Sequence, residues 1–206
     1  MKKTGIANLF ATAVMLAAAS LGAGWADTWD DIKAGAGKVT SISAEFTQEK
    51  HLKILVRPLI SKGVLYFQAP HSLRWEYRSP IQSILLSHNG KTKRYIRNAG
   101  KVTEDAGTSL PALQVVLHEI TRWLNGRFDE NPAFIPHVET GRKIVLTPKE
   151  QNYARMIQRI ELFLSDRPGI VKSVVIYEDE NSFTKIEFEN VVLNPPLLDT
   201  LFQEIE

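Results

Sequence analysis

Leu73-Arg74-Trp75-Glu76-Tyr77 is the stretch that best defines the fold of this 206-residue chain. Successive side chains of a β-strand point to opposite faces, so Leu73, Trp75 and Tyr77 share one face. Arg74 and Glu76 lie on the other. Because one face is apolar and aromatic while the other is charged, the stretch predicts an antiparallel sheet with one packed face.

Strands of the same kind are predicted on both sides of this stretch. From Val39 onward the pattern again has a period of two, with Ile42, Ala44 and Phe46 on one face. The other predicted strands span residues 55–68, 72–78, 82–88, 91–97, 143–147, 157–165, 171–178 and 183–193. Turn residues such as Asn89-Gly90 separate them, and short connections between consecutive strands indicate an antiparallel meander.

Two helices are predicted beside the strands. Thr28 and Asp31 are typical of a capping box at the start of a short helix over residues 32–36. A longer amphipathic helix begins at Ser109 and ends before Asn125-Gly126. Its apolar residues at helical spacing are Leu113, Val116, Leu117, Ile120, Trp123 and Leu124.

One strong helix can cover some nine strands only if the sheet curls around it. We therefore predict a mainly β (α+β) fold. Its expected architecture is a single curved antiparallel sheet that forms an unclosed β-barrel with a helical lid or plug.

The N-terminus predicts an exported protein. Lys2 and Lys3 precede an apolar run over residues 6–21, and Gly24-Trp25-Ala26 forms a small-x-small site. These are the parts of a cleavable secretory signal peptide, which we assign to residues 1–26. We expect residues 27–206 to form one soluble domain in the periplasm, because the apolar run is short for a membrane span.

Composition and motifs exclude several classes of function. The chain contains no Cys, which excludes disulfides and the acylated cysteine of a lipoprotein anchor. It has 25 basic and 23 acidic residues, so the net charge calls for no nucleic-acid partner. His118-Glu119 begins like a zinc-protease helix, but Arg122 stands where the second His should be. No Gly-x-Ser-x-Gly motif occurs, and we expect no catalytic residue, no metal and no cofactor.

A run of basic residues surrounds one predicted hairpin. It consists of Lys91, Lys93, Arg94, Arg97 and Lys101. The first interpretation is a solvated hairpin whose charges guard an exposed sheet edge. The second is contact with anionic lipid headgroups or with an acidic partner.

Short motifs along most of the mature chain match the order found in one known family. They are Phe46-Thr47-Gln48, Gly63 before an apolar strand, Pro70 with Leu73-Arg74-Trp75-Glu76-Tyr77, Pro80, Ser87-His88-Asn89-Gly90-Lys91, and Thr184-Lys185-Ile186-Glu187-Phe188 with Asn190, Val191 and Phe202. Together they resemble the LolA-type family of periplasmic outer-membrane lipoprotein carriers. The resemblance implies an unclosed barrel lidded by helices, a hydrophobic cavity for the acyl chains of lipoproteins, and no enzymatic activity.

The chain departs from the family pattern at two places. In the family an Arg precedes the proline that is Pro70 here and ties the lid to the sheet, but this position is Ala69. The chain also ends at Glu206, where such carriers often continue into a further strand. We therefore expect lid closure to be held differently, and a specialised carrier of another lipid fits the sequence as well as a lipoprotein shuttle.

The favoured hypothesis is a carrier that binds acyl chains in the half-barrel and moves them toward the outer membrane. The candidate cavity lining is Phe46, Phe67, Trp75, Tyr77, Leu117, Ile120, Trp123, Leu162 and Phe188. Any of these is equally compatible with simple core packing. The resemblance implies a monomer with lipoprotein or lipid cargo, an inner-membrane ABC-type releasing complex and an outer-membrane receptor. The alternatives are a lipoprotein- or lipid-sensing regulatory module that binds a membrane-anchored partner, and a periplasmic enzyme of unrecognised type.

Overall fold

The computed structural model of the chain describes residues 28–105, 118–167 and 169–203. The strands are β1 (Ser41–His51), β2 (Leu59–Gln68), β3 (Ser72–Ser79), β4 (Ser83–His88), β5 (Lys91–Asn98), β6 (Lys101–Glu104), β7 (Phe134–Glu139), β8 (Lys143–Pro148), β9 (Arg159–Leu164), β10 (Val171–Tyr177) and β11 (Phe183–Leu193). The helices are α1 (Trp29–Ala36), α3 (Gln151–Ala154) and the 3-10 helix η1 (Asp199–Phe202). Residues 118–124 are also helical.

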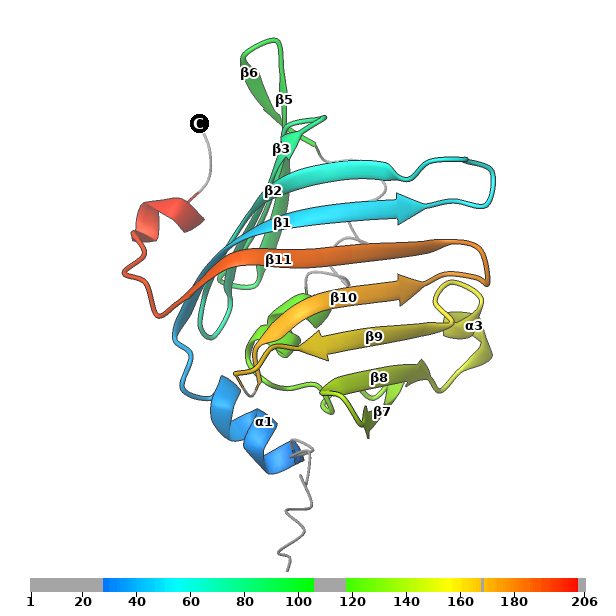
Figure 1. The fold of residues 1–206 in the computed structure, drawn as a ribbon. Helices are drawn as coiled ribbons and strands as arrows, with labels where there is room; N and C mark the ends of the chain where they lie inside the picture. Colours follow the sequence, from blue (N-terminus) through cyan, green and yellow to red (C-terminus); the bar gives the residue numbers. More distant parts are fainter. Residues whose placement is uncertain (1–27, 106–117, 168, 204–206) are drawn as a thin grey trace, which may run out of the picture.

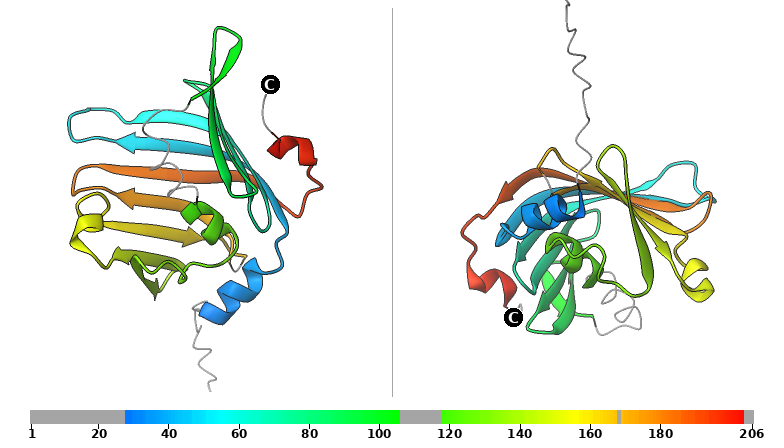
Figure 2. Two further views of the ribbon diagram at one scale, coloured as in Figure 1. Left: turned by 180° about the vertical axis from the view of Figure 1, so that it is seen from behind. Right: turned by 90° about the horizontal axis from the view of Figure 1, so that it is seen from below.

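The strands form one curved antiparallel sheet in the order β6-β5-β4-β3-β2-β1-β11-β10-β9-β8-β7. Two meanders, β1–β6 and β7–β11, therefore meet at the β1–β11 pair in the middle of the sheet (Figure 1). The outermost strands β6 and β7 do not pair with one another, so the barrel stays open. Figure 2 shows the 118–124 helix within the concave side of the sheet. The predicted fold class is confirmed.

Several predicted boundaries are wrong, and each has a local cause. β6 was not predicted because its four residues follow a turn directly, and β7 was not predicted because it contains Pro136. A proline is tolerated in an edge strand such as β7. β2 begins at Leu59 rather than at residue 55, since residues 52–58 form the turn that joins it to β1.

The N-terminal helix also differs slightly from the prediction. α1 begins at Trp29 rather than at residue 32, and the predicted capping box between Thr28 and Asp31 is present. The predicted signal peptide and the part of the long helix before residue 118 lie outside the described residues. None of the described helices is long and apolar enough to cross a membrane.

The main hydrophobic core lies on the concave side of the sheet. Phe46, Leu65 and Trp75 come from three neighbouring strands and are almost fully buried. Ile120 and Trp123 of the helix belong to the same cluster. The alternation read from the sequence is therefore the alternation between this core and the outer face.

A second, smaller core covers the convex side of the first meander. Phe202 of η1 packs with Ile84, Leu86 and Tyr95. The guanidinium of Arg74 donates a hydrogen bond to the carbonyl oxygen of Leu201 at 3.2 Å. The C-terminal segment thus covers outward-facing apolar residues of β4 and β5 that a one-sided sheet would leave in water.

The C-terminal end of the 118–124 helix is fixed against α1. Gly126 ends the helix with a positive φ of 73°, a conformation that glycine adopts without steric cost. A Cβ at this position would lie 2.4 Å from the Cβ of Ala36 in α1. Lys33 of α1 also forms an ion pair with Asp129 at 2.7 Å. The close approach requires glycine here and sets where the helix leaves the concave face.

Candidate lipid-binding site

Four aromatic side chains meet on the concave face near the middle of the sheet. The ring centroids of Phe46 and Trp75 lie 4.5 Å apart, and Tyr77 meets Phe46 edge-on at 5.2 Å. Phe188 of β11 reaches Trp75 at 6.0 Å. Offset and edge-to-face pairs of this kind are favourable beyond the area that they bury. The cluster joins strands that are far apart in the sequence.

The strand register explains why these rings meet. Phe46 pairs with Phe188 on one side and with Gly63 on the other, and Gly63 in turn pairs with Tyr77. A Cβ at Gly63 would lie 2.6 Å from the Cζ atom of Phe46. The absent side chain of Gly63 therefore makes room for the Phe46 ring between β1 and β3.

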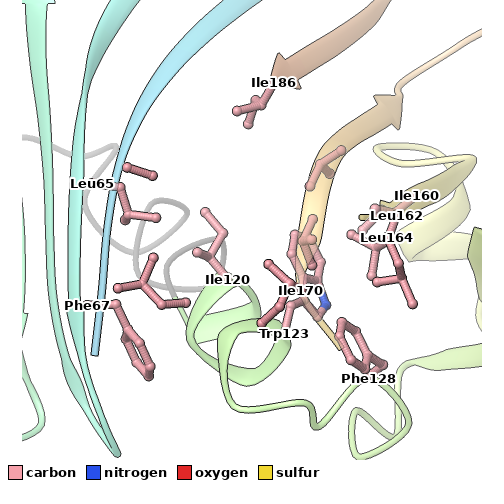
Figure 3. Packing of buried hydrophobic residues seen from close by; sticks show 14 of the residues in the cluster. Leu65, Phe67, Ile120, Trp123, Phe128, Ile160, Leu162, Leu164, Ile170 and Ile186 are labelled. Carbon is pink, nitrogen blue, oxygen red and sulfur yellow. The ribbon is translucent and has the colours of Figure 1, made fainter. Parts of the chain in front are cut away.

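The 118–124 helix covers this aromatic surface. Figure 3 shows Ile120 and Trp123 projecting from the helix between Phe67 of β2 and Leu162 of β9. Phe67 and Leu162 are fully buried, and Ile120 and Trp123 nearly so. Eight of the nine predicted lining residues thus belong to the core or pack against it. The ninth, Leu117, lies outside the described residues.

The space between helix and sheet is nearly filled. Trp75, Ile120, Trp123 and Phe188 line one residual cavity of about 10 Å³. A second cavity of about 10 Å³ lies beside Leu65 and Leu124. Either void is hardly large enough for a single water molecule. In this conformation neither of these two voids beside the described helix has room for an acyl chain.

A much larger cleft lies beside the helix. Its volume is about 810 Å³, within the range of small-molecule sites. Apolar lining comes from Phe134, Ile157, Ile160 and Ile176, while His118, Glu119, Arg122 and Asn131 supply polar groups. Trp123 lines both this cleft and the filled interior. The Trp123 side chain is therefore part of the wall that separates the two.

One hydrogen bond ties the end of the helix to the sheet. The amide Nδ2 of Asn125 donates to the carbonyl oxygen of Pro70, in the β2–β3 turn, at 3.1 Å. It also donates to the carbonyl oxygen of Thr121 at 2.7 Å. Sequence reasoning read Asn125 only as a helix-stop residue and missed this contact. The bond attaches to the same turn that carries Ala69.

Polar groups inside the aromatic cluster are few. The Tyr77 hydroxyl donates to the Oε1 atom of Gln48 at 2.9 Å, and burial raises the pKa of Tyr77 above its ordinary value. The phenol therefore stays neutral at physiological pH. The buried indole Nε1 of Trp75 lies near the Tyr77 hydroxyl but makes no hydrogen bond of ordinary geometry with a described residue. It is a donor that a carbonyl oxygen of a bound molecule would satisfy.

Two of the five residues in the predicted basic run form ion pairs with neighbouring acids. Lys93 pairs with Glu104 and Arg94 with Asp105, each at 3.3 Å. In the part of the chain that the structure describes, no group of three or more His, Cys, Asp or Glu residues is placed to hold a metal ion. The described residues thus offer an apolar surface with isolated polar groups.

By its fold, this chain belongs to the class of open antiparallel barrels that carry a helix on an apolar concave face. The chain is a member of the family described as outer membrane lipoprotein carrier protein LolA, whose model matches residues 37–204.

Individual relatives are more distant. A protein of Proteus mirabilis (strain HI4320) described as an outer-membrane lipoprotein carrier protein is 30% identical over 137 residues. The match spans 63% of this chain and 62% of that protein, less than two thirds of the relative's length.

Two solved structures are similar at low identity. A LolA superfamily protein from Nitrosomonas europaea has 8% identity and a TM-score of 0.42, covering 86% of this chain and 98% of that one. A chain of the MucA/MucB complex of Pseudomonas aeruginosa has 14% identity and a TM-score of 0.41, covering 87% of this chain and 61% of that one.

Proposed function

We propose that this protein is a periplasmic carrier that shields the acyl chains of a lipoprotein or of another lipid, without catalysing a reaction. The observation that supports this most is the continuous apolar concave face of an open sheet, covered by the 118–124 helix. Membership of the lipoprotein carrier family supports the same role. Phe46, Trp75 and Phe188 would form the surface on which the chain lies.

A shield of this kind answers a physical need. Each methylene buried in an apolar environment contributes about 0.8 kcal/mol, so a long acyl chain does not leave a membrane for water on a useful timescale. The carrier must also release its cargo, which requires that the destination bind the chain more tightly. A site that is filled by its own helix when empty meets this condition, because the helix competes with the cargo.

We propose that cargo enters through the cleft and displaces the helix. Trp123 separates the cleft from the aromatic surface, so an outward shift of its side chain would join the two spaces. Glu119 and Arg122, which form an ion pair at the cleft, would face the polar part of the lipid. The indole N–H of Trp75, which makes no hydrogen bond of ordinary geometry with a described residue, would donate to an ester or amide carbonyl oxygen.

Quenching by brominated fatty acid tests where the chain lies. Trp29 packs at the edge of the core in α1, whereas Trp75 lies in the aromatic cluster. Single-reporter variants that retain only Trp75 or only Trp29, with the other tryptophans replaced by Phe, keep the packing aromatic. Bound brominated palmitate is expected to quench Trp75 strongly and Trp29 weakly.

Equal quenching of both reporters would contradict an interior site. So would the absence of quenching in both variants when brominated palmitate is bound. Failure of any acyl chain to bind, together with recovery of a stoichiometric protein partner, would favour the regulatory module instead. Mass spectrometry of lipid extracted from gently purified protein identifies the cargo when binding is found.

A further inference from the structure

The hairpin of β1 and β2 extends past its neighbour β3. β1 and β2 are paired as far as Lys50 and Leu59, whereas β3 joins β2 only from Lys62 inward. Figure 1 shows the hairpin end projecting beyond β3. We call residues 52–60 the hairpin tip. Its position leaves most side chains at this end in solvent.

The hairpin tip is unusually apolar for an exposed turn. Ile54 is 87% exposed and Val56 is fully exposed. Leu55, Leu59 and Ile60 are also exposed, so these nine residues hold five of the eleven large hydrophobic side chains that are exposed among the described residues. Such a concentration on a small protein surface marks an interaction site.

The hairpin tip is also cationic. Lys53 and Arg57 lie within it and Lys62 follows, while the sequence has no Asp or Glu between Glu49 and Glu76. Acids lie beside it on β1, where Glu49 pairs with His51, and in the β10–β11 turn, which also carries Glu180. In that turn Glu178 pairs with Lys50, and Asp179 lies within electrostatic reach of Lys53. Arg57 and Lys62 form no ion pair with a described residue.

We infer that the hairpin tip docks the protein on an anionic phospholipid surface. Ile54 and Val56 would enter the boundary between headgroups and acyl chains, and Arg57 would lie among the phosphates. A bilayer interface offers an anionic layer and an apolar layer within a short distance. Amphipathic segments bind it by burying apolar side chains and by placing basic side chains among the anionic headgroups. A projecting convex turn suits such a surface better than a flat protein interface. The inference concerns docking and does not depend on the cargo.

Docking by the β5–β6 hairpin is less well supported. Its Lys93 and Arg94 are already paired with Glu104 and Asp105, and large exposed apolar side chains are not found in its turn. The hairpin tip combines charge and exposed apolar surface, and the β5–β6 hairpin does not.

Vesicle sedimentation tests the inference. The purified exported protein is expected to bind vesicles of phosphatidylethanolamine with 30% phosphatidylglycerol, and to bind pure phosphatidylcholine vesicles weakly. The double variant Ile54→Ser/Val56→Ser should partition at least tenfold less. Arg57→Gln should lose about fivefold, as expected for one basic side chain near an anionic surface.

Matched controls lie away from the hairpin tip. Val192 is an exposed residue near the end of β11 and pairs with Ser43 near the start of β1, so it lies at the other end of these strands from the hairpin tip. Arg167 is an exposed residue of the β9–β10 turn. Val192→Ser and Arg167→Gln should leave partitioning unchanged. The absence of cysteine allows a second readout. An environment-sensitive dye on Val56→Cys should shift to the blue on anionic vesicles, and a dye on Val192→Cys should not.

Three results would overturn the inference. They are no binding of the unmodified protein to anionic vesicles, equal binding of the hairpin-tip and control variants, and no dye shift at Val56. If the hairpin-tip variants instead lose only the capture of a detergent-solubilised membrane protein, the surface recognises a protein. Loss of acyl-chain binding alone would contradict the proposed carrier role and leave docking intact.

Discussion

The interior beneath the 118–124 helix and the cleft beside it share one sheet but differ in how they are filled. Two voids between the described helix and the sheet measure about 10 Å³ each, while the cleft has a volume of about 810 Å³. Trp123 and Ile176 line both spaces. The difference teaches that the helix, rather than the sheet, determines how much of the concave face is available. Binding beneath it therefore requires movement of the helix.

The largest expected difference between the interior and the cleft comes from removing an aromatic ring from the interior. Phe46→Ala should lower the free energy of unfolding by about 3–5 kcal/mol, because truncating a buried Phe loses packing and leaves a cavity. Tyr153→Ala, at a half-exposed residue of the cleft, should change it by less than about 0.5 kcal/mol. Urea denaturation measures both. Similar losses in the two variants would mean that the cleft is as tightly packed as the interior.

A smaller effect is expected from adding one methyl group beside Phe46. A Cβ at Gly63 would lie 2.0 Å from the carbonyl oxygen of Glu76, so Gly63→Ala should cost about 1–3 kcal/mol through overpacking. Gly37→Ala is the control, since its nearest neighbour would lie at 3.2 Å and its φ is an ordinary −63°. If Gly63→Ala lowers the urea midpoint no more than Gly37→Ala does, the packing around Phe46 can adjust to an added methyl group.

The smallest effect is expected at the attachment of the helix. Asn125→Ala removes the hydrogen bond to Pro70 and should cost about 1 kcal/mol, mostly as easier local opening. Hydrogen exchange of the amides in residues 118–124 should accelerate about fivefold, and that of β9 should stay unchanged. Asn98→Ala, at the exposed end of β5, is the control. Unaltered exchange in the helix would show that apolar packing alone holds it closed.

The sequence was sufficient to predict which face of each strand is buried, but not which strands pair with one another. Alternation placed Leu73, Trp75 and Tyr77 on one side, and the structure agrees that Leu73 and Trp75 are buried. That Phe188 joins them depends on the pairing of β1 with β11, which no local pattern specifies. The short strand β6 and the proline-containing β7 gave too weak a period-two signal to be recognised.

The candidate site shows the same division. Eight predicted lining residues lie in or against one core because apolar side chains at regular spacing face inward. The filled state of that core, the cleft and the Asn125–Pro70 bond could not be predicted. They depend on where the helix rests, which is a property of packing between distant segments.

The position of the β1–β11 pair also has a consequence for the order in which the chain folds. Residues 41–51 must wait for residues 183–193 before the centre of the sheet can form. Contacts between segments so distant in sequence slow folding, whereas each meander can form from nearby hairpins. We therefore expect the meanders β1–β6 and β7–β11 to form first and to pair last. The concave face would then be complete only after nearly all of the chain has been exported.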